Sequence, residues 1–219
     1  MFTEKPNINP SSMFAEKPSL NPAFLHNEYV FRKKVLKLFG GSFKVFDGNE
    51  NLVLYSKQKA FKLKEDFRVY SDENKTTELL ALKTDQIIDM DAKYNVQDSI
   101  TDELVGSIGR QMMKSMLKDE WIFFSKDNQK IGKFTESSTT GAIIRRVVDF
   151  IPFINIFSGL FLRSYIIVDS DNIKIAEIKQ KLTLFVLKYK MNIIEQNPSI
   201  DRRLLISMGI LLAGIEGTQ

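Results

Sequence analysis

The sequence predicts a mainly β protein, a closed antiparallel barrel of about twelve strands around a buried C-terminal helix. Two observations carry this prediction. From about Val30 onward, short segments of alternating polar and apolar residues are separated by clusters rich in Asp, Asn and Gly, as expected for consecutive β-hairpins. The last apolar run, Leu204–Ile215, is hydrophobic on every side of a helical wheel, so a helix there must be enclosed. A slim helix after ten or more strands fits inside a barrel that would otherwise be unfilled.

Five turn clusters punctuate the chain, at residues 47–51, 72–74, 98–103, 126–129 and 170–172. Uninterrupted hairpins of this kind are typical of closed barrels and sandwiches. The 17 Phe residues favour a β-rich interior, because aromatic side chains fit pleated, half-buried surfaces. The segments expected to form strands are SFKVFD, NLVLYS, FRVYS, KYNVQD, LVGSIG, WIFFS, KIGKF, YIIVD, IKIAEIK and the long run LTLFVLKYKMNII.

The terminal helix is expected over residues 201–216, with Ser199 or Asp201 as its N-cap and Gly217 just past its end. Its twelve apolar residues span only about 18 Å. A second apolar run, residues 150–162, is interrupted by Pro152. A membrane-spanning helix needs about 20 apolar residues, so both runs are expected to be buried or interfacial.

Residues 1–28 are expected to be a disordered, Pro-rich tail, with the barrel domain over 29–219. The tail contains a direct repeat, MFTEKPNINP at 1–10 and MFAEKPSLNP at 13–22, and four of the six prolines of the chain. Proline fixes φ and removes a hydrogen-bond donor, which favours extended chain. The repeat is either a doubled peptide ligand for a protein partner, where two copies add avidity, or a duplicated start region with Met13 as a second initiation site.

The composition excludes several classes of site. With no Cys and one His, the chain cannot form a thiolate nucleophile, a Cys-ligated zinc site, an iron–sulfur cluster or a multi-His metal site. His26 has no evident partner for a catalytic dyad, and the GxxG at 106–109 falls in a strand rather than before a helix. We therefore expect no enzyme activity, no cofactor and no metal. No aromatic platform for nucleic acid is visible either.

The net charge of +4 is unevenly distributed. Residues 30–75 carry 11 basic and 6 acidic side chains, a net +5, and residues 140–219 carry 10 and 7, a net +3. The stretch between them, 76–139, is −3, with 8 basic and 11 acidic side chains. Either the positive segments bind an anionic partner, or they reflect the Lys enrichment of a protein from an AT-rich genome.

Three basic sets are candidates for an anionic ligand. In one straight strand, Lys57 and Lys59 would face one side, and Lys62 and Lys64 the other. These lysines either bind an anionic ligand or protect a solvated strand edge from pairing. A helix over 110–118 would align basic residues at i, i+4 and i+8, a stripe that suits an anionic membrane or is simply solvated. The third set, Arg145 and Arg146, precedes the apolar run at 150–162. The candidates are Lys57, Lys59, Lys62, Lys64, Arg110, Lys114, Lys118, Arg145 and Arg146.

The apolar segment at 143–162 is the candidate for membrane or partner contact, through Phe150, Phe153, Phe157 and Phe161. Basic residues beside such a segment resemble an interfacial anchor. Alternatively, the segment is a helical insert packed on the barrel or a dimer interface.

Several blocks of sequence resemble bacterial members of the LURP-one-related family: VLKLFGGSFKVFD at 35–47, KQKAFKLKEDFRVYSD at 57–72, LKDEW at 117–121 and DRRLLISMGILLAGIE at 201–216. This family is grouped with tubby C-terminal domains and phospholipid scramblases, so the resemblance implies a twelve-stranded barrel around a C-terminal helix. The resemblance implies little about function. Tubby domains bind phosphoinositides through surface Lys and Arg, whereas most LURP-one-related members lack an assigned activity.

The chain departs from the scramblase pattern in two places. The stretch before the last helix offers only Glu195 and Asp201 in place of an acidic calcium segment, and no Cys is present for acylation. The tubby terminal signature is also missing. Calcium-activated scrambling is therefore not implied.

The function expected from these observations is a non-enzymatic tubby-like domain that binds anionic phospholipid headgroups, or another ligand, at a membrane surface. The alternative is a soluble protein-interaction module that uses the repeated tail or the 143–162 segment. In both cases we expect a cytoplasmic protein, in the first peripheral at the membrane. No signal peptide is visible, since the first residues lack a basic stretch and an apolar stretch.

Overall fold

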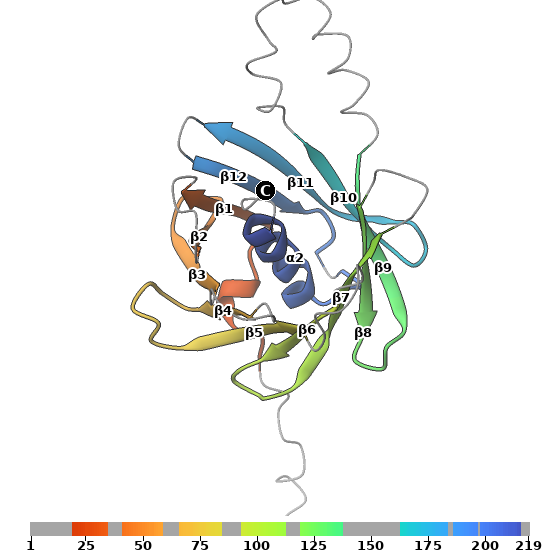
Figure 1. Ribbon diagram of the computed structural model, residues 1–219, viewed down its shortest axis with the longest axis horizontal. Coiled ribbons are helices and arrows are strands. Elements are labelled where there is room, and N and C mark those ends of the chain that lie inside the picture. Colours follow the sequence, from red (N-terminus) through yellow and green to blue (C-terminus); the bar gives the residue numbers. More distant parts are fainter. Residues whose placement is uncertain are drawn as a thin grey trace, which may run out of the picture.

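The computed structural model describes residues 19–34, 41–58, 66–84, 93–112, 119–137, 163–183, 186–196 and 198–215. Within them, twelve strands form one closed antiparallel barrel in which each strand pairs with its neighbours in sequence, and the first strand pairs with the last (Figure 1). The predicted fold class is confirmed. The strands are β1 (Glu28–Lys34), β2 (Ser42–Asp47), β3 (Leu52–Gln58), β4 (Asp66–Tyr70), β5 (Glu78–Thr84), β6 (Lys93–Asp98), β7 (Leu104–Met112), β8 (Asp119–Ser125), β9 (Lys130–Glu136), β10 (Ser164–Asp169), β11 (Lys174–Thr183) and β12 (Val186–Ile193).

Alternation of burial along the strands follows the alternation of the sequence. In β12, Leu187, Tyr189, Met191 and Ile193 point inward and are buried, while the residues between them face outward. The predicted turn clusters are also found at strand ends, and each hairpin turn contains one residue with positive φ: Glu50, Lys75, Asp102, Asn128 or Asn172. Asp47, Asp98 and Asp169 accept backbone N–H groups within their own turns, which favours these tight connections.

Helix α2 (Arg202–Ile215) runs through the centre of the ring of strands (Figure 1). Its residues from Leu204 to Gly214 are all buried, which confirms the predicted internal helix. Asp201 caps the helix by accepting the backbone N–H of Arg203 at 2.8 Å. The other predicted cap, Ser199, instead donates its hydroxyl to Asp169 at 3.1 Å. Gly217 lies outside the described residues.

Two glycines allow the helix to pass close to the barrel wall. A Cβ on Gly209 would lie 2.3 Å from the ring of Phe31, and a Cβ on Gly214 would lie 2.3 Å from the ring of Phe67. At the C-terminal end of α2, the inward-facing Lys33 donates to the carbonyl of Gly214 at 2.9 Å and so satisfies an acceptor in the last helical turn. Burial lowers the pKa of Lys33.

The end of the barrel where α2 begins, which we call the turn end, carries the five hairpin turns. The segment before β1 closes it through a short helix, η2 (Pro22–Phe24), which inserts Phe24, 1% exposed, into the core. Leu20 and Ala23 also pack against the core, so part of the stretch assigned to the tail, 1–28, lies against the barrel, while residues 1–18 are outside the described part of the chain.

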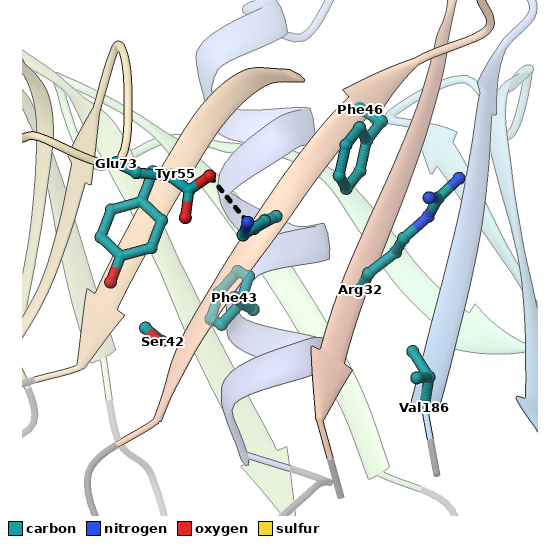
Figure 2. Close-up of a pocket in the computed structure, with 8 residues that line it drawn as sticks. Arg32, Ser42, Phe43, Phe46, Tyr55, Glu73 and Val186 are labelled. Atoms are coloured by element: carbon teal, nitrogen blue, oxygen red, sulfur yellow. Dashed lines mark hydrogen bonds and ion pairs between the residues drawn. The ribbon is translucent and has the colours of Figure 1, made fainter. Parts of the chain in front are cut away.

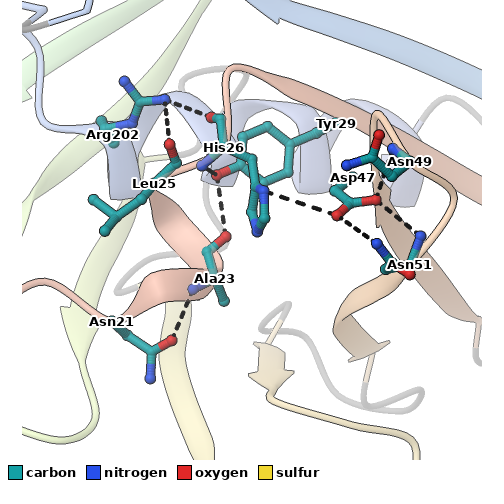
Figure 3. A network of polar contacts seen from close by, with 9 residues as sticks. All are labelled: Asn21, Ala23, Leu25, His26, Tyr29, Asp47, Asn49, Asn51 and Arg202. Carbon is teal, nitrogen blue, oxygen red and sulfur yellow. Dashed lines mark hydrogen bonds and ion pairs between the residues drawn. The ribbon is translucent and has the colours of Figure 1, made fainter.

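Arg202 holds this closing segment in place (Figure 3). Its buried guanidinium donates to the backbone carbonyls of Phe24, Leu25, His26 and Gln196 and to the side-chain carbonyl of Asn27. The hydroxyl of Tyr29 donates to the carbonyl of Ala23 at 3.0 Å, and burial raises the pKa of Tyr29. The first helical residue thus ties the start of the barrel to the start of the helix.

Candidate anion-binding site

Four cationic side chains stand directly opposite one another across four neighbouring strands. Lys181 of β11 is opposite Lys188 of β12, Lys188 is opposite Arg32 of β1, and Arg32 is opposite Lys44 of β2. Arg32, Lys44 and Lys188 each lie between two buried residues of their strand and therefore face outward. Lys181 is exposed and shares this face because it is paired with Lys188. We call this row, Lys181–Lys188–Arg32–Lys44, the cation ladder. Like charges directly opposite destabilise a sheet, so the ladder calls for an explanation beyond folding.

Two further lysines extend this basic surface. Lys179 of β11 and Lys190 of β12 are opposite each other on the same outer face. Both have carboxylate partners: Lys179 pairs with Glu177 at 2.9 Å and Lys190 with Glu28 at 2.8 Å. Among the described residues, the ladder lysines of these strands, Lys181 and Lys188, form no salt bridge. Hydrogen bonds from Lys174 and Lys179 lower the pKa of Glu177 to about 2, so this carboxylate stays ionised well below neutral pH.

The cation ladder joins the two positive segments of the sequence. Arg32 and Lys44 belong to the +5 segment at 30–75, and Lys181 and Lys188 belong to the +3 segment at 140–219. These segments meet because β1 pairs with β12 to close the barrel. The net charge of each segment indicated a basic surface, but only the closing pair of strands places the charges side by side.

A groove of about 450 Å³ opens along the β1, β2 and β3 end of the ladder (Figure 2). Arg32 and Lys44 contribute its cations, and Phe46 and Tyr55 contribute aromatic rings. The guanidinium of Arg32 lies over the ring of Phe46, 4.2 Å from its centroid, a cation–π contact that holds the side chain at the groove. Aromatic rings between cations suit a ligand that combines anionic and apolar parts.

Both cations of the groove have carboxylate partners that an anion could displace. Arg32 pairs with Glu50, whose side chain is 70% exposed, and the hydrogen bond from Arg32 lowers the pKa of Glu50. Lys44 pairs with Glu73 at 2.7 Å, and both of these side chains are exposed. Exposed pairs of this kind contribute about 0–1 kcal/mol, so exchanging the carboxylate for a ligand anion costs little.

Arg32 also carries an unused donor. Its Nε is buried and has no hydrogen-bond partner within the part of the chain that the structure describes. Buried N–H groups usually have a partner, so this donor is a candidate contact for a ligand oxygen in the groove.

Few of the residues predicted as ligand contacts are in the described part of the chain. Lys57 is exposed on the outer face of β3, opposite Ser42 and Arg68 and next to the groove rather than in the ladder. The other predicted lysines, Lys59, Lys62, Lys64, Lys114 and Lys118, lie outside the described residues. So do Arg145, Arg146, Phe150, Phe153, Phe157 and Phe161.

The helical stripe predicted from Arg110 is wrong at its start. Arg110 lies in strand β7, which continues to Met112, and its backbone is paired with Trp121 of β8. It shares the inner face with Ile108, and its guanidinium lies 5.8 Å from the ring of Trp121. The apolar spacing of RQMMKSMLK suggested a helix, but pairing with β8 determines the conformation of its first three residues.

The sequence did not single out the six cations of this surface: Arg32, Lys44, Lys179, Lys181, Lys188 and Lys190. Strand parity would have placed each of them on an outer face. What was missing was the register between strands, which a single sequence does not reveal. The sequence also shows no evident partner for the single histidine, whereas in the structure His26 lies 3.9 Å from Asp47 and edge-on to Tyr29, within the network that closes the turn end (Figure 3).

The structure offers two further negative findings for the described residues. No group of three or more His, Cys, Asp or Glu side chains there could hold a metal ion. No helix among them is long and apolar enough to cross a membrane.

Comparison with known proteins identifies the family. A family model described as LURP-one-related matches residues 52–213, well over half of the chain. The chain belongs to the LURP-one-related family. This family is part of the tubby-like superfamily, in agreement with the barrel and its internal helix. Among curated proteins, none matches this LURP-one-related chain.

Proposed function

We propose that this LURP-one-related protein is a non-enzymatic domain that binds anionic phospholipid headgroups at a membrane surface through the cation ladder. The observation that carries the proposal is the run of four directly opposed cations on four adjacent strands. Glu50 and Glu73 offset part of the repulsion in this row, but Lys181 and Lys188 have no salt bridge among the described residues, so we attribute the row to a ligand rather than to folding. The resemblance to tubby domains, which bind phosphoinositides through surface Lys and Arg, supports the same conclusion.

The surroundings of the ladder favour a headgroup at a membrane over a free anion. The groove beside Arg32 and Lys44 offers room for a headgroup, and Phe46 and Tyr55 lie where the edge of a lipid layer could contact them. Lys181 and Lys188 extend the positive charge over the neighbouring strands and would face other anionic lipids. Each basic residue near an anionic surface contributes about 1 kcal/mol to binding.

The proposal is tested by vesicle flotation of the full chain. Phosphatidylcholine vesicles are compared with vesicles that also contain phosphatidylserine or a phosphoinositide, at low and high salt. We expect binding to the anionic vesicles only, and weaker binding as salt increases. The double substitution Lys181→Gln with Lys188→Gln should reduce affinity by about 30-fold, the effect of two basic contacts.

The matched control removes two charges at the turn end of the barrel, with Lys126→Gln and Lys130→Gln. Both lysines are exposed at the turn between β8 and β9, whereas Lys181 and Lys188 lie near the opposite ends of β11 and β12. This pair should retain nearly wild-type binding. No binding of the wild type to any anionic vesicle, or an equal loss in both double variants, would contradict the proposal. Selective loss of binding to a nucleic acid or a protein would assign the ladder to that partner instead.

A further inference from the structure

A second groove, of about 640 Å³, lies at the turn end of the barrel, away from the cation ladder. One wall is the segment 19–22, which leads into η2, and the other is the turn between β6 and β7 at residues 98–103. Phe24 and Leu79 line it between these walls, and Asp201 and Arg203 line it at the start of α2.

This groove has the properties of a peptide site. Ile100 on its rim is 59% exposed, a large apolar side chain open to solvent. The hydroxyl oxygen of Thr101 is buried and has no hydrogen-bond partner among the described residues. Asp98 and Asp201 both pair with Arg203, at 2.7 Å in each case, while Glu103 is exposed. The groove thus offers an apolar contact, an unused hydroxyl and an excess of negative charge.

The wall at 19–22 is the end of the second copy of the tail repeat. Residues 13–22 read MFAEKPSLNP, and their last four residues, SLNP, are the ones in place against the barrel. Leu20 packs against the hydrophobic core, and the side chain of Asn21 accepts the N–H of Ala23 at 3.0 Å to cap η2. Pro22 then begins η2. The apolar residue, the Asn and the Pro each have a structural role in docking.

The first copy carries the same three residue types in the same order. Residues 7–10 read NINP, so Ile8, Asn9 and Pro10 correspond to Leu20, Asn21 and Pro22. A chain of nine residues from Pro10 to Ser19 can extend to about 30 Å, so the first copy can reach all of the groove. Tethering also raises its local concentration to about millimolar, which makes a weak site sufficient.

We propose that residues 1–10, the first copy of the repeat, bind in this groove beside the docked end of the second copy. The first copy supplies residue types that match the groove: an apolar residue for the exposed Ile100, an amide for the unused hydroxyl of Thr101 and a lysine for Glu103. The repeat is therefore a duplicated docking segment for the turn end of its own barrel, and the bound tail covers Ile100.

The absence of Cys from the chain allows a direct test on the full protein. A nitroxide label is attached to an Asn7→Cys variant, and amide signals are compared between the paramagnetic and reduced states. We expect loss of the signals of Ile100, Thr101 and Glu103, with the signals of Ser42, Lys57 and Lys83 at the other end of the strands unchanged. Unchanged signals at residues 100–103 would overturn the proposal.

Two substitutions outside the core check the contacts. Ile8→Asp in the tail and Ile100→Asp on the exposed rim should each restore the amide signals, whereas Ile8→Leu should leave the signal loss intact. An effect that persists in Ile8→Asp would count against the proposed apolar contact. Mixing labelled chain with unlabelled, isotope-enriched chain separates binding within one molecule from exchange between copies. In this mixture only the enriched, unlabelled copy is observed, so loss of its signals at residues 100–103 would overturn binding by a chain's own tail.

Discussion

At the scale of single residues, Arg32 links the fold to the candidate site. Its side chain stacks on Phe46, pairs with Glu50 and keeps a buried Nε without a partner in the described residues. These contacts hold the guanidinium at the groove before any ligand binds. Pre-positioning of this kind lowers the entropy that binding would otherwise cost.

Glu50→Gln should strengthen binding to anionic vesicles by about five-fold, because it removes one negative charge beside Arg32 and frees the guanidinium. Stability should change by less than about 1 kcal/mol, since the carboxylate of the pair is 70% exposed. Flotation and urea unfolding measure the two effects. Asp127→Asn, an exposed acid on the far turn, removes the same charge elsewhere, and equal gains in both variants would contradict a local role for Glu50.

Asp98 shows how a turn carboxylate is tied to the helix. Burial acts to raise its pKa, but hydrogen bonds from Arg203 and from the amides of Thr101 and Ile100 together lower the pKa below 3.8. The unfolded chain therefore takes up this proton before the folded chain does. The stabilisation is complete above about pH 4 and is lost as the pH falls through the folded-state pKa.

Asp98→Asn should lower the free energy of unfolding by about 1.5–3 kcal/mol at pH 7, the range for a hydrogen bond to a charged group. It should also reduce the loss of stability between pH 5 and pH 3. Urea unfolding across this range measures both effects. Asp127→Asn is the control, and parallel pH profiles for wild type and Asp98→Asn would show that Asp98 does not supply the acid sensitivity.

At the scale of elements, the small residues of helix α2 are explained by the barrel strands that surround it. Alanine normally favours a helix over glycine by about 1 kcal/mol. Gly209 reverses this preference, since a Cβ there would lie 2.3 Å from Phe31 on β1. The small residues that weaken α2 as an isolated helix are therefore the ones that let it fit inside the barrel.

Gly209→Ala should destabilise the protein by about 1–3 kcal/mol, the usual cost of overpacking a core. Adding Phe31→Leu should recover part of this loss, because the smaller side chain makes room for the new methyl group. The measurement is urea unfolding of both single variants and the double variant. Gly48→Ala, where a Cβ would be in ordinary contact with Glu28, is the control. Additive effects of the two core changes would contradict the predicted clash.

At the scale of the whole molecule, closure of the barrel brings together charges that are far apart in sequence. Lys188 lies between Lys181 and Arg32, with a like charge on each side. Glu50 offsets part of this repulsion, since it pairs with Arg32 and Lys188 also attracts it, but the two opposed like-charge pairs remain. Proteins commonly give up stability where function requires it.

Lys188→Gln should raise the free energy of unfolding by about 0.4–2 kcal/mol at low salt, from two opposed like-charge pairs. The gain should shrink in 0.5 M salt, because screening weakens repulsion in the wild type. Lys130→Gln serves as the control. A loss of stability in Lys188→Gln at low salt would show that the ladder is not repulsive. The combination of higher stability and weaker vesicle binding would be the signature of a functional surface.

Local patterns were sufficient to predict much of this fold. Alternation identified most strands, Asp- and Asn-rich clusters identified the turns, and Asp201 was among the predicted helix caps. Two strands were not singled out. In β5, Leu79, Leu80, Ala81 and Leu82 are all buried, so no alternation is visible. The other is β1, which begins where the predicted tail ends. The segment before it, with Phe24, was assigned to the tail because its docking depends on Arg202, about 180 residues away.

The sequence by itself determined the barrel class, the internal helix and the absence of thiol chemistry, because each depends on composition or on periodicity within one segment. Only the tertiary structure decided where charge gathers. Arg32 and Lys188 are neighbours because β1 and β12 pair at one register, and that register depends on all twelve strands closing around α2. Side-chain period is a local property, whereas strand partnership is set by the closed ring as a whole.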